Sequence, residues 1–215
     1  MARKTKEDTE LTYSALLDAA GQVFFDKGVA RTTLTDIATA AGLTRGAIYW
    51  HFKDKAALLQ ALFEQGKLPM EAMLAELSLC TDADPVGALR TMCVQALTTL
   101  AQSPRQQRIL SIMFHKCENI GEVAAVMVQE LACRDECLNR FKGVLQQAID
   151  QGQLPADTDV HLSVQTLHNF MMGSMREWLF APGSYDLAQV APAMVDMLMA
   201  GLRTHPPRVR SALMD

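Results

Sequence analysis

The sequence predicts an all-α protein. Apolar residues recur at i, i+3 and i+4 along most of its 215 residues, which is the spacing of one face of a helix. The regular alternation of β-branched and polar residues that marks strands is absent. The segments between proline- and glycine-containing breaks are long and rich in Ala, Leu and Met, which are strong helix formers.

The first expected helix ends at Lys27 and Gly28. A cation in the last turn followed by a glycine is typical of a helix C-terminus. Before this helix, we expect Arg3, Lys4 and Lys6 to form a flexible basic arm. The apolar stripe of the helix consists of Leu16, Leu17, Ala20, Val23 and Phe24.

Two short helices separated by a glycine turn are expected next. Thr33 and Asp36 form a T-x-x-D capping box at the start of the first, and Gly42 ends it. Thr44 is the expected N-cap of the second, which runs to about Phe52. Two short helices joined in this way are typical of a helix-turn-helix unit.

The second short helix has one face for the core and another for a partner. Ile48 and Phe52 lie four residues apart and are expected to face inward, with part of Trp50 beside them. Arg45 and Tyr49, also four apart, then face outward. An exposed arginine can donate two hydrogen bonds to a guanine in the major groove of DNA, and a tyrosine can reach a phosphate or a thymine methyl group.

Other residues around this helix complete a predicted set of DNA contacts. Gly46 is small, so the backbone can come close to base edges. Thr33 presents a hydroxyl and N–H groups to a phosphate oxygen. We predict base contacts for Arg45 and phosphate contacts for Tyr49, His51, Lys55 and Thr33. The full predicted set is Thr33, Thr44, Arg45, Gly46, Tyr49, His51 and Lys55.

A fourth helix is expected to begin at Lys53 or Asp54, with a kink or a break at Pro69. Beyond it, prolines divide long helical segments, and there are no repeats or low-complexity tracts. The segmentation predicts a small N-terminal three-helix domain at 1–55 and a larger helical domain at 56–215.

Charge, cysteine usage and hydropathy limit the classes of function. The net charge is −4, but residues 1–55 carry eight Lys/Arg against seven Asp/Glu, while 56–215 carry 12 against 17. A locally basic end can bind DNA because phosphate contacts are local at physiological ionic strength. Five cysteines without a CxxC pair fit reduced thiols, and no apolar run approaches the length of a membrane span. We therefore expect a cytoplasmic protein with no membrane association.

No motif predicts an enzyme, a cofactor or a metal site. The sequence lacks a glycine-rich phosphate loop and a G-x-S-x-G motif, and no nucleophile is paired with a base. Cys133 and Cys137, four residues apart, could form a redox sensor or two metal ligands, although free cysteines are more often small buried apolar residues. His161 and His168 share a helix face without a third ligand.

Residues 11–58, and above all the stretch GVARTTLTDIATAAGLTRGAIYWHFKDKAALL, resemble the DNA-binding domain of the TetR family of transcriptional repressors. The stretches MARKTK, FHKCE and WLFAPGSYDL resemble the acriflavine-resistance branch of that family, whose members repress multidrug efflux pumps. The resemblance implies a homodimer that binds a palindromic double-stranded DNA operator until a hydrophobic small molecule releases it. It also implies the same seven DNA-contacting residues as the geometry of the short helices.

The resemblance assigns ligand binding and dimerisation to the 56–215 domain. Thr158–Phe180 and Leu187–Leu202 hold more apolar residues than one face buries, which fits a four-helix interface between two copies; the alternative is core within one chain. Arg176 lies in an apolar helix, where a cation needs a partner or a cavity. A regulator that senses oxidation through its cysteines is the alternative function. The implied ligand-binding residues are Phe63, Met92, Cys93, Ala96, Leu110, Met113, Phe114, Cys137, Phe141, Leu167, Met171, Met172 and Arg176.

Overall fold

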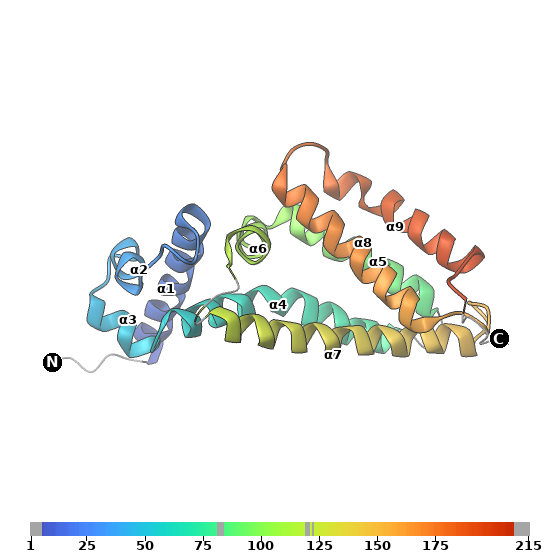
Figure 1. Cartoon of the computed structure of the whole chain (residues 1–215), viewed down its shortest axis with the longest axis horizontal. Helices are drawn as coiled ribbons and strands as arrows, with labels where there is room; N and C mark the ends of the chain where they lie inside the picture. Colours follow the sequence, from blue (N-terminus) through green and yellow to red (C-terminus); the bar gives the residue numbers. More distant parts are fainter. Residues whose placement is uncertain (1–5, 81–83, 119–120, 122, 209–215) are drawn as a thin grey trace. The chain divides into compact units, whose positions relative to one another are not determined.

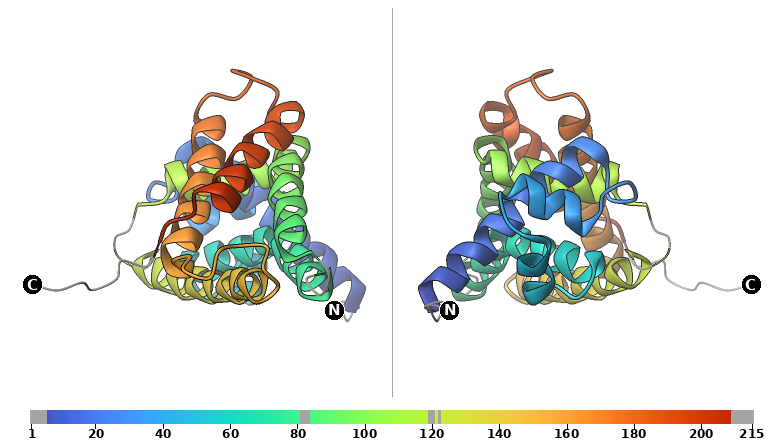
Figure 2. Two further views of the ribbon diagram at one scale, coloured as in Figure 1. Left: turned by 90° about the vertical axis from the view of Figure 1, so that its right-hand side faces the viewer. Right: turned by 90° about the vertical axis from the view of Figure 1, so that its left-hand side faces the viewer.

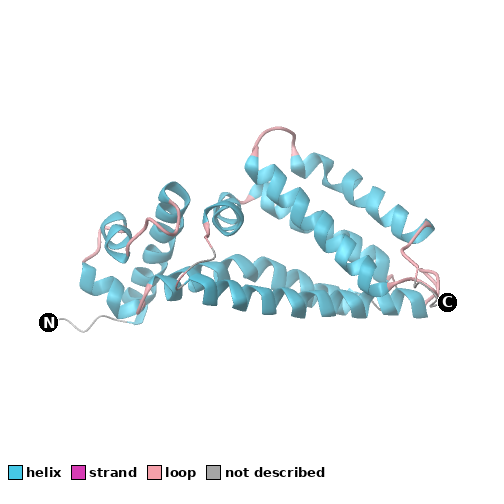
Figure 3. Cartoon of the chain, viewed as in Figure 1, coloured by secondary structure: helices cyan, strands magenta, loops and turns pink. Residues whose placement is uncertain are grey.

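The computed structural model describes residues 6–80, 84–118, 121 and 123–208, and this part of the chain contains helices and no strand (Figure 3). The all-α prediction is therefore confirmed. The helices, labelled in Figure 1 where there is room, are α1 (Lys6–Lys27), α2 (Leu34–Ala40), α3 (Arg45–His51), α4 (Lys55–Cys80), α5 (Pro85–Gln102), α6 (Pro104–Ser111), the π-helix η1 (Ile112–Lys116), α7 (Val123–Asp150), α8 (Val160–Phe180) and α9 (Leu187–Thr204).

The helices form two compact units. The first unit comprises Met1–Leu68 and Arg105–Glu130, and the second comprises Pro69–Pro104 and Leu131–Asp215. The three N-terminal helices therefore share a unit with α6, η1 and the first turns of α7, and α4 and α7 each contribute residues to both units. The functional division at residue 55 stays a prediction.

A continuous apolar core holds the first unit together. It joins the stripe of α1 and the inner faces of α2 and α3 to residues of α4, α6, η1 and α7. The right-hand view of Figure 2 looks onto α1, α2 and α3, which pack against one another. Burial of this much apolar surface is the main stabilising contribution to the unit. Its fully buried members include Leu16, Leu17, Phe24, Ile37, Ile48, Leu58, Leu59, Phe63 and Ile112.

The glycines predicted to follow α1 and α2 lie at the helix ends, whereas the flexible arm predicted before α1 is wrong at Lys6. Gly28 and Gly42 have φ angles of 81° and 68°, the left-handed conformation that a glycine after a helix adopts readily. Lys6 is already helical in α1, so its assignment to a flexible arm was wrong. Arg3 and Lys4 lie outside the described residues.

Of the two outcomes predicted at Pro69, a kink or a break, the break is excluded, because α4 continues through the proline to Cys80. A proline within a helix lacks one N–H donor and disturbs the carbonyls of the preceding turn. The side-chain amide of Gln106, on α6, donates to the carbonyl of Gly66 at 3.2 Å. This donor from outside the helix satisfies a carbonyl one turn before the proline.

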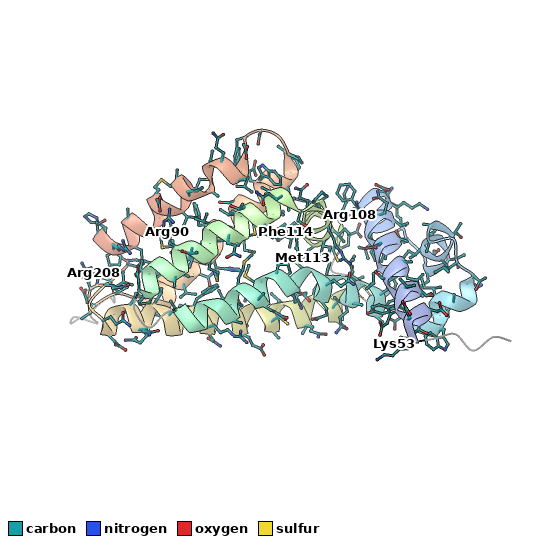
Figure 4. The ribbon with its side chains drawn as sticks, turned by 180° about the vertical axis from the view of Figure 1, so that it is seen from behind. Lys53, Arg90, Arg108, Met113, Phe114 and Arg208 are labelled. Carbon is teal, nitrogen blue, oxygen red and sulfur yellow. The ribbon has the colours of Figure 1, made fainter. Side chains whose placement is uncertain are left out.

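In the second unit, α5, α8 and α9 lie side by side (Figures 1 and 2). Their buried faces are apolar, with residues such as Leu89, Val164 and Val195 almost fully enclosed. At the edge of the packing, Arg90 on α5, labelled in Figure 4, forms a bidentate ion pair with Asp196 on α9, with Nη2 3.0 Å from Oδ2. The hydrogen bonds and charge of Arg90 lower the pKa of Asp196.

Hydrogen bonds outside the helices hold both ends of the α8–α9 pair. At the turn between the helices, the indole N–H of Trp178 donates to the carbonyl of Tyr185 at 3.1 Å. At the other end, the N–H of Asp159 donates to the carbonyl of Pro207 at 2.8 Å. Thr158 and Arg208 form an antiparallel bridge there, and Arg208, labelled in Figure 4, pairs with the carboxylate of Asp157.

Candidate nucleic-acid interface

The start of α2 is a complete capping box. The hydroxyl of Thr33 accepts a hydrogen bond from the N–H of Asp36 at 3.1 Å, and the carboxylate of Asp36 accepts from the N–H of Thr33 at 2.9 Å. Lys27 lies 3.2 Å from the same carboxylate. The hydrogen bonds from Thr33, together with the bond and charge of Lys27, lower the pKa of Asp36 to about 2. The predicted capping box is therefore confirmed, and its hydrogen bonds favour the ionised form of the Asp36 carboxyl group.

Thr44 begins α3, as predicted. Its hydroxyl accepts a hydrogen bond from the N–H of Ala47 at 3.2 Å, which satisfies one of the donors that a helix start leaves open. The turn between the two short helices is closed by the N–H of Leu43, which donates to the carbonyl of Ala38 at 2.8 Å. These local bonds fix the direction in which the seven residues of α3 leave the turn.

The inner face of α3 is formed by Ile48 and Phe52, which are 0% and 3% exposed, as predicted. Trp50 is 71% exposed, so its partial assignment to the core was wrong. Two helical positions from Ile48 correspond to a rotation of about 200°, which points Trp50 away from the core. The exposed indole therefore adds to the outer face of α3.

The outer face of α3 carries Thr44, Arg45, Gly46 and Tyr49, all exposed. The guanidinium carbon of Arg45 lies 5.4 Å from the centre of the Tyr49 ring, within the range of a cation–π contact. This contact holds the guanidinium against the first turns of α3. A cation at a helix N-terminus beside a residue without a side chain can approach base edges in a major groove.

His51 lies in a group of rings that joins α3 to α1. Its ring centre is 4.6 Å from that of Trp50 in an edge-on arrangement and 5.8 Å from that of Tyr13. Tyr13 in turn stacks on Phe52, with the ring centres 5.2 Å apart. Sequence analysis missed Tyr13, because nothing local indicates that this residue of α1 reaches α3.

Lys55 has a structural contact that sequence analysis also missed. Its ammonium group donates to the carbonyls of Val29 and Ala30 at 2.9 and 3.3 Å and so ties the start of α4 to the loop between α1 and α2. The neighbouring Lys53, labelled in Figure 4, is the more exposed cation, with 82% of its side chain exposed and only a 3.8 Å contact to Asp54. A phosphate contact by Lys55 stays a prediction.

The residues of the predicted ligand pocket are divided between the two units. In the first unit, Phe63 is fully buried in the core, while Leu110, Met113 and Phe114 are half-buried on α6 and η1, where Figure 4 labels the last two. In the second unit, Cys137 and Met172 are half-buried and Arg176 is exposed, so its place in an apolar stretch does not bury its charge. The buried members of the second unit are Met92, Cys93, Ala96, Phe141, Leu167 and Met171.

Cys93, Cys117, Cys133 and Cys137 form no disulfide bond. Burial raises the pKa of Cys93 to about 12 and also raises the pKa values of Cys117 and Cys137, the last against the charge of Arg140. A raised pKa keeps a thiol protonated and slow to react. Among the described residues, no group of three or more His, Cys, Asp or Glu side chains could hold a metal ion, and no helix could span a membrane.

Comparison with known proteins gives two family matches. Residues 16–62 match the bacterial regulatory proteins of the tetR family, and residues 84–204 match the C-terminal region of MAATS-type transcriptional repressors. The HTH-type transcriptional regulator AcrR of Shigella flexneri is 36% identical over 199 residues, which cover 93% of each chain.

Two solved structures share the whole fold. NalD, the secondary repressor of the MexAB-OprM multidrug efflux pump in Pseudomonas aeruginosa, is 30% identical with a TM-score of 0.84, over 93% of this chain and all of that one. SmeT, solved in complex with triclosan and described as the repressor of the Stenotrophomonas maltophilia multidrug efflux pump SmeDEF, is 30% identical with a TM-score of 0.77 over 95% of this chain and all of that one. The relatives are transcriptional regulators.

Proposed function

This chain belongs to the TetR family of transcriptional regulators, and from that premise we propose that it represses a multidrug efflux operon. The observation that carries the proposal is the outer face of α3, where an exposed arginine and tyrosine stand at the start of a helix that is capped at one end and anchored in the core. AcrR and NalD, each similar to it over 93% of the chain, support the efflux assignment. The protein would act in the cytoplasm, where its DNA is.

In this proposal, Arg45 contacts base edges, while Thr33, Tyr49, His51 and Lys55 contact phosphates around it. Phosphate contacts position the protein and base contacts select the sequence. The hydroxyl of Thr33 and the ammonium group of Lys55 already have partners within the chain. Their phosphate contacts would therefore be secondary to those of the exposed Tyr49.

We further propose that two copies of the chain associate through α8 and α9 and that this dimer binds a palindromic operator. The buried apolar residues of α8, such as Leu167 and Met175, belong to the core of one chain and are not available to a second copy. Leu162 and Met197 are 48% and 69% exposed and Phe180 is 74% exposed, so these are the most exposed large apolar side chains of the two helices and the first candidates for an interface. Replacing Met197 with glutamate should shift the sedimentation coefficient toward that of a monomer.

Release from DNA is proposed to follow binding of a hydrophobic molecule, as the SmeT–triclosan complex suggests. One apolar core joins α1–α3 to α4, α6 and η1. A shift of α6 or η1 would therefore change the packing, and so the position, of the helix-turn-helix. Coupling of about 1–3 kcal/mol between ligand and operator would weaken DNA binding roughly 5–150-fold. Sensing by cysteine oxidation is not favoured, since burial raises the pKa values of three of the thiols.

Selection from a random duplex library, followed by titration of the selected duplex, tests the proposal. Wild-type protein should select a palindrome, and Arg45→Ala should bind it about 5–150-fold more weakly per site, the loss expected for one bidentate base contact. The matched control is Arg140→Ala, an exposed arginine on α7. No enriched sequence, or equal binding by Arg45→Ala, would exclude the role given to α3. A panel of hydrophobic drugs added to the complex then tests release.

A further inference from the structure

A solvent-open pocket of about 360 Å³ lies between α7 and α8 within the second unit. This volume is at the lower end of the range of about 300–1,000 Å³ for small-molecule sites. None of its lining residues is among those expected to bind a hydrophobic inducer. The pocket is therefore a separate site whose chemistry has to be derived from its own walls.

The floor of this pocket is apolar. Leu138 of α7 and Val164 of α8 line it and are 8% and 1% exposed. Positions three and four apart on a helix share a face, so Leu138 lies on the same face of α7 as the polar lining residues Arg134 and Lys142. Val164 lies in the same way on the face of α8 that carries His161. An apolar floor of two branched side chains favours the hydrocarbon part of a ligand over a fully polar ion.

The rim is polar and on balance cationic. Arg134 and Lys142, two turns apart on α7, both line the pocket, against the single carboxylate of Asp135. Arg134 donates to Asp135 through Nε and Nη2 at 3.1 and 2.8 Å, which uses two of its five N–H donors. Lys142 donates to the Asn139 side chain at 3.1 Å, which uses one of three. Donors for an external anion therefore remain on both cations.

α8 completes the rim with His161 and Gln165, whose side chains line the pocket opposite these cations. Burial lowers the pKa of His168 on α8, and the positive charge of Arg134 on α7 lowers it further. A positive rim is unusual in this part of the chain, because residues 56–215 carry an excess of acidic groups. The site thus combines a locally positive rim with an apolar base.

We propose that this pocket binds a small amphipathic carboxylate, such as an aromatic acid. The ring would lie on Leu138 and Val164, and the carboxylate would accept hydrogen bonds from Arg134 and Lys142, which are stronger with a charged acceptor. A neutral hydrophobic compound would accept no charged hydrogen bonds from the rim, and inorganic phosphate would make no contact with the apolar floor. Both are therefore poorer ligands for this pocket.

Calorimetric titration of the purified protein with sodium benzoate tests the proposal. Benzoate should bind measurably at millimolar concentrations, and benzamide, which has the same shape without the charge, should bind about tenfold more weakly, as should inorganic phosphate. The double variant Arg134→Gln/Lys142→Gln should lose about tenfold in benzoate affinity, because two exposed charge contacts are removed. The control Arg140→Gln removes a cation from the same helix outside the pocket and should bind as the wild type does.

Three results would overturn the proposal: no heat of binding with benzoate, equal binding of benzamide, or unchanged benzoate affinity in the double variant. Circular dichroism of the double variant verifies that it is folded, and both substituted side chains are at the surface or half-buried. Operator affinity of the same variant is measured in parallel. Loss of benzoate binding with unchanged operator binding would show that the two ligands are bound by different residues and that the DNA-binding part of the variant is intact.

Discussion

The two units of this chain use their apolar residues differently. In the first, one core runs through α1–α4, α6, η1 and the start of α7, so the helix-turn-helix has no boundary of its own within the unit. In the second, α5, α8 and α9 bury one face each and leave Leu162, Met197 and Phe180 exposed, and α7 and α8 line a pocket with an apolar floor and a cationic rim. The core of the first unit thus holds α3 in place with Tyr49 and Trp50 exposed, whereas the second unit exposes apolar side chains on α8 and α9 and an open pocket.

The largest expected effect comes from breaking the core of the first unit. Phe24 is fully buried and its neighbour Phe25 is 38% exposed, so the two form a matched pair on α1. Phe24→Ala should lower the free energy of unfolding by about 3–5 kcal/mol, and Phe25→Ala by about 1 kcal/mol or less. Urea denaturation measures both. Similar losses for the two variants would mean that α1 is not anchored by its buried stripe.

A pair of glycines compares the units directly. A Cβ added at Gly66 of α4 would lie 2.7 Å from Cγ2 of Ile109 on α6, while one added at Gly143 of α7 would meet nothing within 4 Å. Gly66→Ala should therefore destabilise the protein by about 1–3 kcal/mol. Gly143→Ala should instead stabilise it by about 0.5–1 kcal/mol, because alanine is the better helix former.

Thermal unfolding of the two variants gives the sign of each effect. Adding Ile109→Ala to Gly66→Ala should recover part of the loss in a double-mutant cycle, since the clash partner is removed. A Gly66→Ala protein as stable as the wild type would show that α4 and α6 can separate freely, which would contradict a continuous core in the first unit.

The smallest expected effect concerns the capping box of α2. The pKa of Asp36 is lowered to about 2 from an ordinary value of 3.8, so its ionised form favours the folded state above pH 3.8 and that contribution is lost as the pH falls toward 2. Asp36→Asn should flatten the dependence of stability on pH across this interval. Thr33→Ala, which removes the cap hydroxyl, should cost about 1 kcal/mol at neutral pH.

Acid titration followed by circular dichroism measures the Asp36 effect. Glu136→Gln, at an exposed position on α7, serves as the control and should keep the acid response of the wild type. An unchanged response in Asp36→Asn would mean that its hydrogen bonds with Thr33 do not contribute to stability in solution.

The features that sequence predicted correctly are local ones. The capping box at Thr33 and Asp36, the cap at Thr44 and the left-handed glycine at 42 each depend on residues within four positions. The inward spacing of Ile48 and Phe52 is equally local. Helix starts, helix ends and the buried face of a short helix can therefore be derived without knowledge of tertiary packing.

Several features that sequence missed depend on distant contacts. Lys55 reaches carbonyls 25 and 26 positions away, and Tyr13 stacks on Phe52 from another helix. The hydrogen bond from Gln106 on α6 to the carbonyl of Gly66 in α4 is likewise indicated by no pattern within α4. Trp50 was misplaced because a run of rings favours the core unless the rotation between neighbouring positions is taken into account.

The bridge between Thr158 and Arg208 has a practical consequence for anyone handling this protein. Because Pro207 and Arg208 bond to residues that precede α8, the α8–α9 hairpin is closed into a ring of non-covalent contacts. A cleavage site or affinity tag inserted before Pro207 would open that ring and expose the last turn of α9 to fraying. Tags are better joined beyond Arg208, where this closure is left intact.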